Sequence, residues 1–308
     1  MRDKVNSGPP SSLAREERAV RWGFTVPALL VITLIVAFPI LYNIVMSLHS
    51  WFVASGKDPS WVGLENYLHF LSDERFWNSM RVTAFFSLGA LTLQTILGTS
   101  LALFLNRSFL GKNIVKLIFL FPIAATPVAV SLIWGMMYNY DLGIINYFLQ
   151  SIGLKPLLWL ASPESVLAAL IITDTWQWTP LILLIVLASL ESLPIDPFES
   201  ARVDGANILQ IIWHITLPMV RPAIVVAVMI RSIDAIKTFD LIYVMTQGGP
   251  DIASENLNLF VFQMGFSYFR MGAASSLAII LFTLVLGVNI ILALVRNTGE
   301  RRMRGGTT

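Results

Sequence analysis

Long apolar segments alternate with short polar connections along the whole chain. A helix needs about 20 apolar residues to cross the hydrocarbon core of a bilayer, and six segments reach roughly that length. They cover approximately residues 24–48, 80–105, 115–138, 166–190, 222–246 and 272–296. Lipid offers no hydrogen-bond partners to the backbone, so such segments satisfy their peptide groups only as helices. The pattern therefore predicts an all-α polytopic membrane protein with six transmembrane helices.

The amino-acid composition also indicates a membrane protein. Of the 308 residues, 56% are hydrophobic and 13% are charged, and the mean hydropathy is +0.70. A soluble domain of this size could not bury so much apolar surface. The net charge of +2 gives no indication of a nucleic-acid partner. Because cysteine is absent and the three histidines lie far apart, we expect no disulfide, no metal site and no cofactor in this chain.

The first apolar segment is longer than the ~7–15-residue core of a signal peptide, so we expect it to remain as an anchor. Basic residues then indicate the orientation, because cytoplasmic loops are rich in lysine and arginine. With both termini inside, the cytoplasmic side holds Arg2, Lys4, Arg15, Arg18, Arg21, Arg107, Lys112, Lys116, Arg202, Arg221, Arg296, Arg301, Arg302 and Arg304. The opposite side retains Lys57, Arg75, Arg81, Lys155 and Arg270. We therefore predict a cytoplasmic segment 1–22, a transmembrane domain 23–298 and a cytoplasmic tail 299–308.

The connection between the fourth and fifth segments, residues 195–218, is polar but strongly patterned. Asp196 is a good N-cap residue, and Pro197 suits the first position of a helix. Glu199 would then complete an arrangement similar to a capping box. Gly205 can adopt a positive φ and end this first short helix.

A second short helix is predicted to follow. Asn207 can cap it with the help of Gln210, and Ile208, Ile211, Ile212 and Ile215 give it an apolar face. Pro218 marks its end or a sharp kink. Two short helices joined at a glycine would project into the cytoplasm and bury little surface within their own chain. A partner with a matching cleft would explain them better than a hairpin lying on the bilayer, because the first helix has little apolar face.

This connection resembles the EAA loop of the permease subunits of binding-protein-dependent ABC importers. The pattern E-x-A-x-x-x-G-A followed by I-x-L-P is matched by Glu199, Ala201, Gly205, Ala206, Ile215, Leu217 and Pro218. Two positions depart from the family pattern, because Ser200 stands in the middle of the E-A-A triplet and Ile212 replaces a frequent phenylalanine. Asp204 to Ala206, GLENY at 63–67, Phe76 with Trp77, and the T-x-G-G-P turn ending at Pro250 resemble the carbohydrate branch of the family.

The resemblance implies the type I importer permease fold, also called MetI-like, in a bacterial or archaeal plasma membrane. The resemblance implies as partners a second permease that is a different chain, two ATP-binding-cassette subunits, an extracytoplasmic solute-binding protein, a sugar-like substrate and the surrounding membrane lipid. ATP and Mg would be bound by the ATPase subunits, with Glu199 facing a basic group there. The coupling residues implied are Glu199, Ser200, Ala201, Asp204, Gly205, Ala206, Ile212, Leu217 and Pro218.

The fifth segment carries a charged row, in which Arg231, Asp234, Lys237 and Asp240 recur every three residues. This spacing lets opposite charges pair along a helix. Each unpaired charge would cost ~2.5–3.5 kcal/mol at a helix centre, so the row is not expected to face lipid. Two roles are open for it: an ion-pair ladder against the partner permease or, together with Tyr243, part of the lining of a pathway for a polyhydroxylated solute. One row could serve both roles.

The fourth segment contains a second candidate for the pathway. Trp176 and Trp178 could offer their faces to a sugar ring, and Gln177 could bond a hydroxyl group. The alternative is that both tryptophans only pack against neighbours or lipid. Pro122 and Pro127 predict a kink in the third segment.

These observations predict a permease subunit of an ATP-driven, binding-protein-dependent importer for a sugar or sugar derivative. The chain has no G-x-x-x-x-G-K-[ST] phosphate loop and no catalytic constellation, so it is not expected to be an enzyme. An ion-coupled secondary transporter, using protonation of Asp234 or Asp240, is the alternative. It would leave the capped double helix unexplained, and the internal repeats common in such transporters are not visible.

Overall fold

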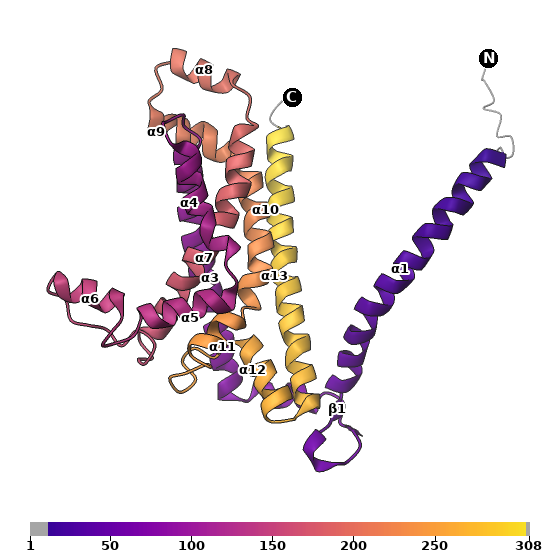
Figure 1. Cartoon of the computed structure of the whole chain (residues 1–308). Coiled ribbons are helices and arrows are strands. Elements are labelled where there is room, and N and C mark those ends of the chain that lie inside the picture. Colours follow the sequence, from indigo (N-terminus) through magenta and orange to yellow (C-terminus); the bar gives the residue numbers. More distant parts are fainter. Residues whose placement is uncertain (1–11, 306–308) are drawn as a thin grey trace.

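The computed structural model of the chain describes residues 12–305 and is built almost entirely of helices (Figure 1). The outermost parts of both predicted cytoplasmic ends, 1–11 and 306–308, lie outside the described residues. The elements in chain order are α1 (Ser12–Ser47), β1 (His49–Ser50), η1 (Val53–Ser55), β2 (Ser60–Trp61), α2 (Glu65–Leu71), α3 (Glu74–Leu105), α4 (Lys112–Ala124), α5 (Pro127–Met137), α6 (Ile144–Ser151), α7 (Val166–Glu191), α8 (Asp196–Val203), α9 (Ile208–Ile211), η2 (Ile212–Thr216), α10 (Leu217–Ile236), α11 (Asp240–Met245), α12 (Leu257–Phe262), η3 (Gln263–Ser267) and α13 (Met271–Gly305). Within this described part, five helices are long and apolar enough to cross a membrane, or six if one bent pair counts as a span.

The bent pair replaces the single, kinked third helix that was expected over 115–138. Helices α4 and α5 meet at an angle of 100°. The chain is extended at Ala125, and Thr126 caps α5 by accepting a hydrogen bond from the Ala129 N–H at 3.4 Å. Pro127 then occupies the start of α5, where its missing N–H costs nothing. The predicted kink near the prolines is thus a complete break between two helices.

The fifth segment also differs from the expected span over 222–246. A helical run extends from Ile208 to Ile236 through α9, the π-helix η2 and α10. Pro218 lies in the first turn of α10 and does not end the second short helix, so that part of the prediction is wrong. The physical reason is the π turn, in which the Leu217 N–H bonds back to Ile212 O and carries the chain into α10.

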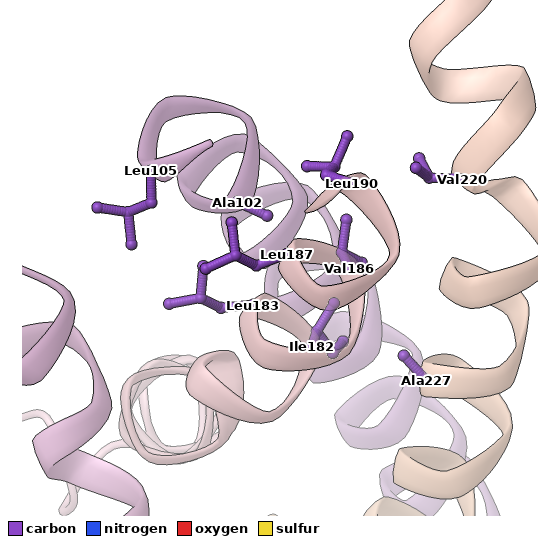
Figure 2. Close-up of a cluster of buried hydrophobic side chains, with 9 residues drawn as sticks. All are labelled: Ala102, Leu105, Ile182, Leu183, Val186, Leu187, Leu190, Val220 and Ala227. Carbon is purple, nitrogen blue, oxygen red and sulfur yellow. The ribbon is translucent and has the colours of Figure 1, made fainter. Parts of the chain in front are cut away.

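The centre of the molecule is the packing of α3 against α7. A Cβ atom on Gly98 would lie 2.9 Å from the Cβ atom of Ile182, so only glycine permits this close approach. A buried apolar cluster joins α3, α7 and α10 at the end nearest α8 and α9 (Figure 2). Its buried members are Ala102, Leu105, Ile182, Leu183, Val186, Leu187, Leu190, Val220 and Ala227. The connection between α7 and α10 therefore starts from a firmly packed base.

Helix α1 diverges from this bundle (Figure 1). It meets the other helices near β1, and none of its most apolar span-length stretch within Val20–Ser47 is buried. Its beginning, the end of α13, and helix α8 all lie toward one end of the molecule in Figure 1.

Candidate functional site

Helix α8 lies beyond the end of the bundle and has no buried residue (Figure 1). It begins at Asp196 itself, with Ile195 in the capping position and no side-chain cap. The predicted N-cap at Asp196 and the capping-box arrangement with Glu199 are therefore wrong. Both carboxylates instead sit within the first turn, where negative charge is favoured by the helix dipole.

The link between α8 and α9 confirms the prediction for Gly205, which has a φ of +80°. The Ala206 N–H donates to Ala201 O at 2.9 Å, and the Gly205 N–H donates to Arg202 O at 3.1 Å. This pair of bonds is the Schellman closure of a helix end. No atom lies within 4 Å of a Cβ built at Gly205, so the backbone conformation alone demands glycine here.

The capping box predicted for the second helix is also confirmed. The Gln210 N–H donates to Asn207 Oδ1 at 2.9 Å, and the Asn207 N–H donates to Gln210 Oε1 at 2.8 Å. Helix α8, closed at its C-terminal end, and helix α9, capped at its start, are joined by the four residues 204–207 and form a protrusion of defined shape. We call residues 195–218 the coupling loop.

The coupling loop presents a mixed polar and apolar surface. Glu199, Ser200, Asp204, Gly205 and Pro218 are exposed, and Ala201, Ala206, Ile212 and Leu217 are half-buried. No hydrogen bond or ion pair within residues 12–305 engages the Glu199 carboxylate. Sequence reasoning missed three large apolar side chains that are also exposed here, Val203 at 87%, Leu209 at 66% and Trp213 at 67%. The sequence did contain a signal for these three positions, because they are large apolar residues in a polar connection and lie outside the predicted isoleucine face.

A buried polar network occupies the interior of the bundle. Arg231 of α10 is 1% exposed, and its Nη2 donates to Asp174 Oδ2 of α7 at 2.5 Å. Its Nε donates to Gln94 Oε1 of α3 at 3.1 Å, and the Gln94 amide donates to the same Asp174 oxygen at 2.8 Å. The Arg231 Cζ also lies 5.0 Å from the ring centroid of Trp178. We call these four side chains the Arg231 network.

The other members of the charged row are separated from Arg231. Lys237 ends α10, Asp240 begins α11, and the continuous stripe that was expected does not exist. Asp234 and Lys237 pair at 3.4 Å with about half of each side chain exposed, 47% and 50%. Tyr243 is 41% exposed and stacks on Phe239 with ring centroids 5.1 Å apart. We call the four partly or fully exposed side chains on either side of the break between α10 and α11, Asp234, Lys237, Asp240 and Tyr243, the polar patch.

The three candidates from the fourth segment point in different directions. Consecutive residues on a helix are about 100° apart, so Trp176, Gln177 and Trp178 do not share a face. Trp176 is 39% exposed and meets the ring of Trp134 at 5.7 Å. Gln177 is 2% exposed and donates to Ala125 O at 3.2 Å, which fastens the break between α4 and α5.

A second, partly buried ion pair, which the sequence analysis did not anticipate, lies at the opposite end from the coupling loop. Arg75 at the start of α3 donates to both carboxylate oxygens of Glu255, at 2.8 and 2.7 Å. Its guanidinium also bonds Gln263 and lies 4.8 Å from the ring centroid of Phe260. These contacts fasten the segment between α11 and α12 onto α3.

Comparisons with known proteins place these features in context. The model of a family described as the binding-protein-dependent transport system inner membrane component matches residues 94–305. The chain is 37% identical over 284 residues to the trehalose/maltose transport system permease protein MalF of Thermococcus litoralis, covering 91% of this chain and 95% of that protein. It is 30% identical over 266 residues to the trehalose transport system permease protein SugA of Mycobacterium tuberculosis strain H37Rv, covering 86% and 85%.

Among solved structures, the chain is similar to a bacterial ABC transporter involved in the import of the acidic polysaccharide alginate. The TM-score is 0.81 at 21% identity, and the match covers 94% of this chain and 99% of that one. This likeness shows the fold, and it confirms the predicted all-α, MetI-like importer permease architecture.

Proposed function

Since the chain belongs to the family of binding-protein-dependent transport system inner membrane components, it is a transport permease subunit rather than an enzyme, and we propose that it imports a sugar or sugar derivative. The observation that carries this proposal is the 37% identity to a trehalose/maltose permease over 91% of the chain. A further relative, 32% identical, is a sulfoquinovosyl glycerol permease, SmoG of Agrobacterium fabrum. Sugars and sugar conjugates recur among these relatives, so we assign that solute class to this chain.

The coupling loop is the proposed contact for an ATP-binding-cassette subunit, which would bind ATP and Mg. Its free Glu199 carboxylate suits a basic group on such a partner, and the exposed Val203, Leu209 and Trp213 supply apolar contact area. Interfaces commonly combine an apolar centre with charged groups of this kind. Ser200, Ala201, Asp204, Gly205 and Ala206 shape the protrusion between these contacts.

Motion of the coupling loop would be transmitted along a continuous helical run. Residues 208–236 connect the loop to Arg231, and the Arg231 network then joins α10 to Asp174 of α7 and Gln94 of α3. These three helices would therefore move as one body when the ATPase closes, as in rigid-body alternating access. We assign Arg231, Gln177 and Trp178 to this scaffold, because their polar or aromatic groups already have partners within the chain.

The proposed solute pathway runs along the polar patch of Asp234, Lys237, Asp240 and Tyr243. These side chains are partly or fully exposed, and their acceptors, donors and aromatic ring match the groups of a polyhydroxylated solute. Trp176 is retained as a more distant candidate because part of its ring is accessible.

Two further parts of the assembly, and the orientation of the chain, are also proposed. A second permease would pack against the unburied length of α1, and an extracytoplasmic solute-binding protein would meet the end opposite the coupling loop. Both termini would be cytoplasmic. Arg107, Lys112 and Lys116 lie in or beside the α3–α4 connection, on the side that the positive-inside rule assigns to the cytoplasm.

The test is solute uptake by proteoliposomes that contain the complete complex, with ATP inside or outside as the orientation requires. We expect uptake of a trehalose- or maltose-like sugar to need ATP and to persist when a protonophore collapses the proton gradient. Glu199→Lys should lower uptake at least about tenfold, the factor that ~1.4 kcal/mol of lost coupling contact produces. Glu65→Lys, the same charge reversal at an exposed position on α2 at the end opposite the coupling loop, should leave binding of the ATPase subunit unchanged, whereas Glu199→Lys should weaken it. Uptake that ignored ATP and stopped with the proton gradient would support the ion-coupled alternative instead.

A further inference from the structure

A groove of about 390 Å³ separates the coupling loop from the ends of α3 and α7. Its apolar lining includes Leu103 of α3, Leu190 of α7, Phe198 of α8, and Ile208 and Ile211 of α9. Sites for small organic ligands usually measure ~300–1,000 Å³ and are lined mainly by apolar side chains. We call this space the loop groove. Its size and lining suit part of an acyl chain.

Two arginines give the loop groove a positive charge. Arg107 and Arg202 both line it and both are exposed. Neither guanidinium has a hydrogen bond or ion pair within the part of the chain that the structure describes. The acidic Glu191 at the end of α7 faces Lys112, at 3.6 Å. An apolar space beside two uncompensated cations fits a ligand with an anionic head and an apolar body.

The level of the loop groove in the membrane identifies the source of such a ligand. Arg107 follows the last residue of α3, Leu105, by two positions, and Leu190 is in the last turn of α7. Both spans therefore leave the bilayer here, at the depth of the lipid headgroups. Basic pockets between helices on the cytoplasmic side commonly bind anionic lipid headgroups.

We propose that the loop groove binds one anionic phospholipid of the cytoplasmic leaflet. Its phosphate lies between Arg107 and Arg202, and an acyl chain covers Leu103, Leu190 and Ile211. This inference rests on the orientation given under the proposed function. The lipid fills the space beneath the coupling loop and supports α8 and α9 against the bundle. An ATPase side chain is a poorer occupant, because the apolar lining descends to the ends of the spans, where lipid is already present.

The experiment uses the complete complex in phosphatidylcholine nanodiscs that contain a trace of phosphatidylglycerol with a photoreactive diazirine in its acyl chain. After illumination, mass spectrometry of the digested chain locates the adducts. We expect labelling in the peptides that carry Leu103, Leu190 and Ile211, competed by unlabelled phosphatidylglycerol but not by extra phosphatidylcholine. Removing each arginine should weaken the labelling about fivefold.

Matched variants make the result decisive. Arg107→Gln with Arg202→Gln should abolish most labelling. Arg221→Gln matches either single variant, because it removes one positive charge from an exposed position on α10 outside the groove, and it should leave labelling intact. If the double variant fails to fold, Ile208→Trp provides a second test. This variant keeps both arginines but fills the groove, so it should also suppress labelling. Equal labelling by a phosphatidylcholine probe, labelling that survives the double variant, or adducts of a photoreactive residue at Ile208 with the ATPase in place of lipid would each overturn the proposal. Labelling requires neither ATP nor sugar, so it is independent of the uptake test.

Discussion

At the scale of single residues, burial divides the charged side chains of the fifth segment into two kinds. Arg231 is 1% exposed and depends on Asp174 and Gln94, whereas the side chains of Lys237 and Asp234 are about half exposed, 50% and 47%, and pair in contact with solvent. A buried ion cannot recover its lost hydration from solvent, so removing one partner of a buried pair is costly. An exposed pair usually contributes ~0–1 kcal/mol.

Replacing Arg231 with methionine should therefore destabilise the purified complex by roughly 3–5 kcal/mol, because Asp174 would be left buried without a partner. Adding Asp174→Leu should restore much of the loss. Lys237→Gln serves as the exposed control and should cost less than ~1 kcal/mol. The measurement is the thermal midpoint in detergent, compared across a double-mutant cycle. If the single and double variants unfolded alike, the two side chains would not be energetically coupled.

At the scale of elements, the coupling loop has more regular secondary structure than its polarity suggests. The Asn207 capping box fixes the start of α9, and the π turn at 212–216 leads into α10 without interruption. The angle between α8 and α9 then depends on the four-residue link 204–207. Gly205 supplies the left-handed conformation of that link, with a φ of +80°.

Gly205→Val should reorient α8, because a β-branched residue in the left-handed region is strained by at least ~1–2 kcal/mol. We expect sugar uptake to fall strongly while the permease itself stays folded. Gly205→Asn should retain most uptake, since asparagine tolerates this conformation. Gly153 offers a matched control, with a φ of +81° and open space around it in the loop after α6. Equal losses of uptake in Gly153→Val and Gly205→Val would argue against a specific role for the angle between α8 and α9.

At the scale of the whole molecule, α1 separates from the bundle that the other long helices form (Figure 1). Its exposed side chains include Leu34 at 59%, Ile35 at 68% and Phe38 at 65%. Lipid can cover one face of such a helix. We expect the second permease of the proposed assembly to cover another face.

A photoreactive residue introduced at Phe38 should give a covalent adduct between this chain and the second permease in the complete complex. The adduct mass would also show whether that permease is the same chain or a different one. The same residue at Phe86, which is 0% exposed within α3, should give no adduct between subunits. Adducts with lipid alone at Phe38 would show that α1 does not pack against a partner.

Several features of this protein were determined by the sequence alone because their causes are local. Apolar segments of membrane-spanning length require helices wherever they occur. The Asn207–Gln210 capping box and the left-handed Gly205 each involve a few neighbouring residues, and both were predicted correctly. The coupling-loop motif was recognisable for the same reason, since its residues are consecutive. Local reasoning was less reliable at Asp196, where helix start and cap position differ by a single residue.

The tertiary structure alone decided which side chains meet. Arg231 bonds Asp174, 57 positions away, and Gln94, 137 positions away, whereas the spacing of three had suggested partners on its own helix. The 100° angle between α4 and α5 likewise depends on packing, in which Gln177 of α7 holds Ala125. In an apolar interior a polar group gains most from whichever partner the packed helices bring within reach, and no pattern along one segment contains that information.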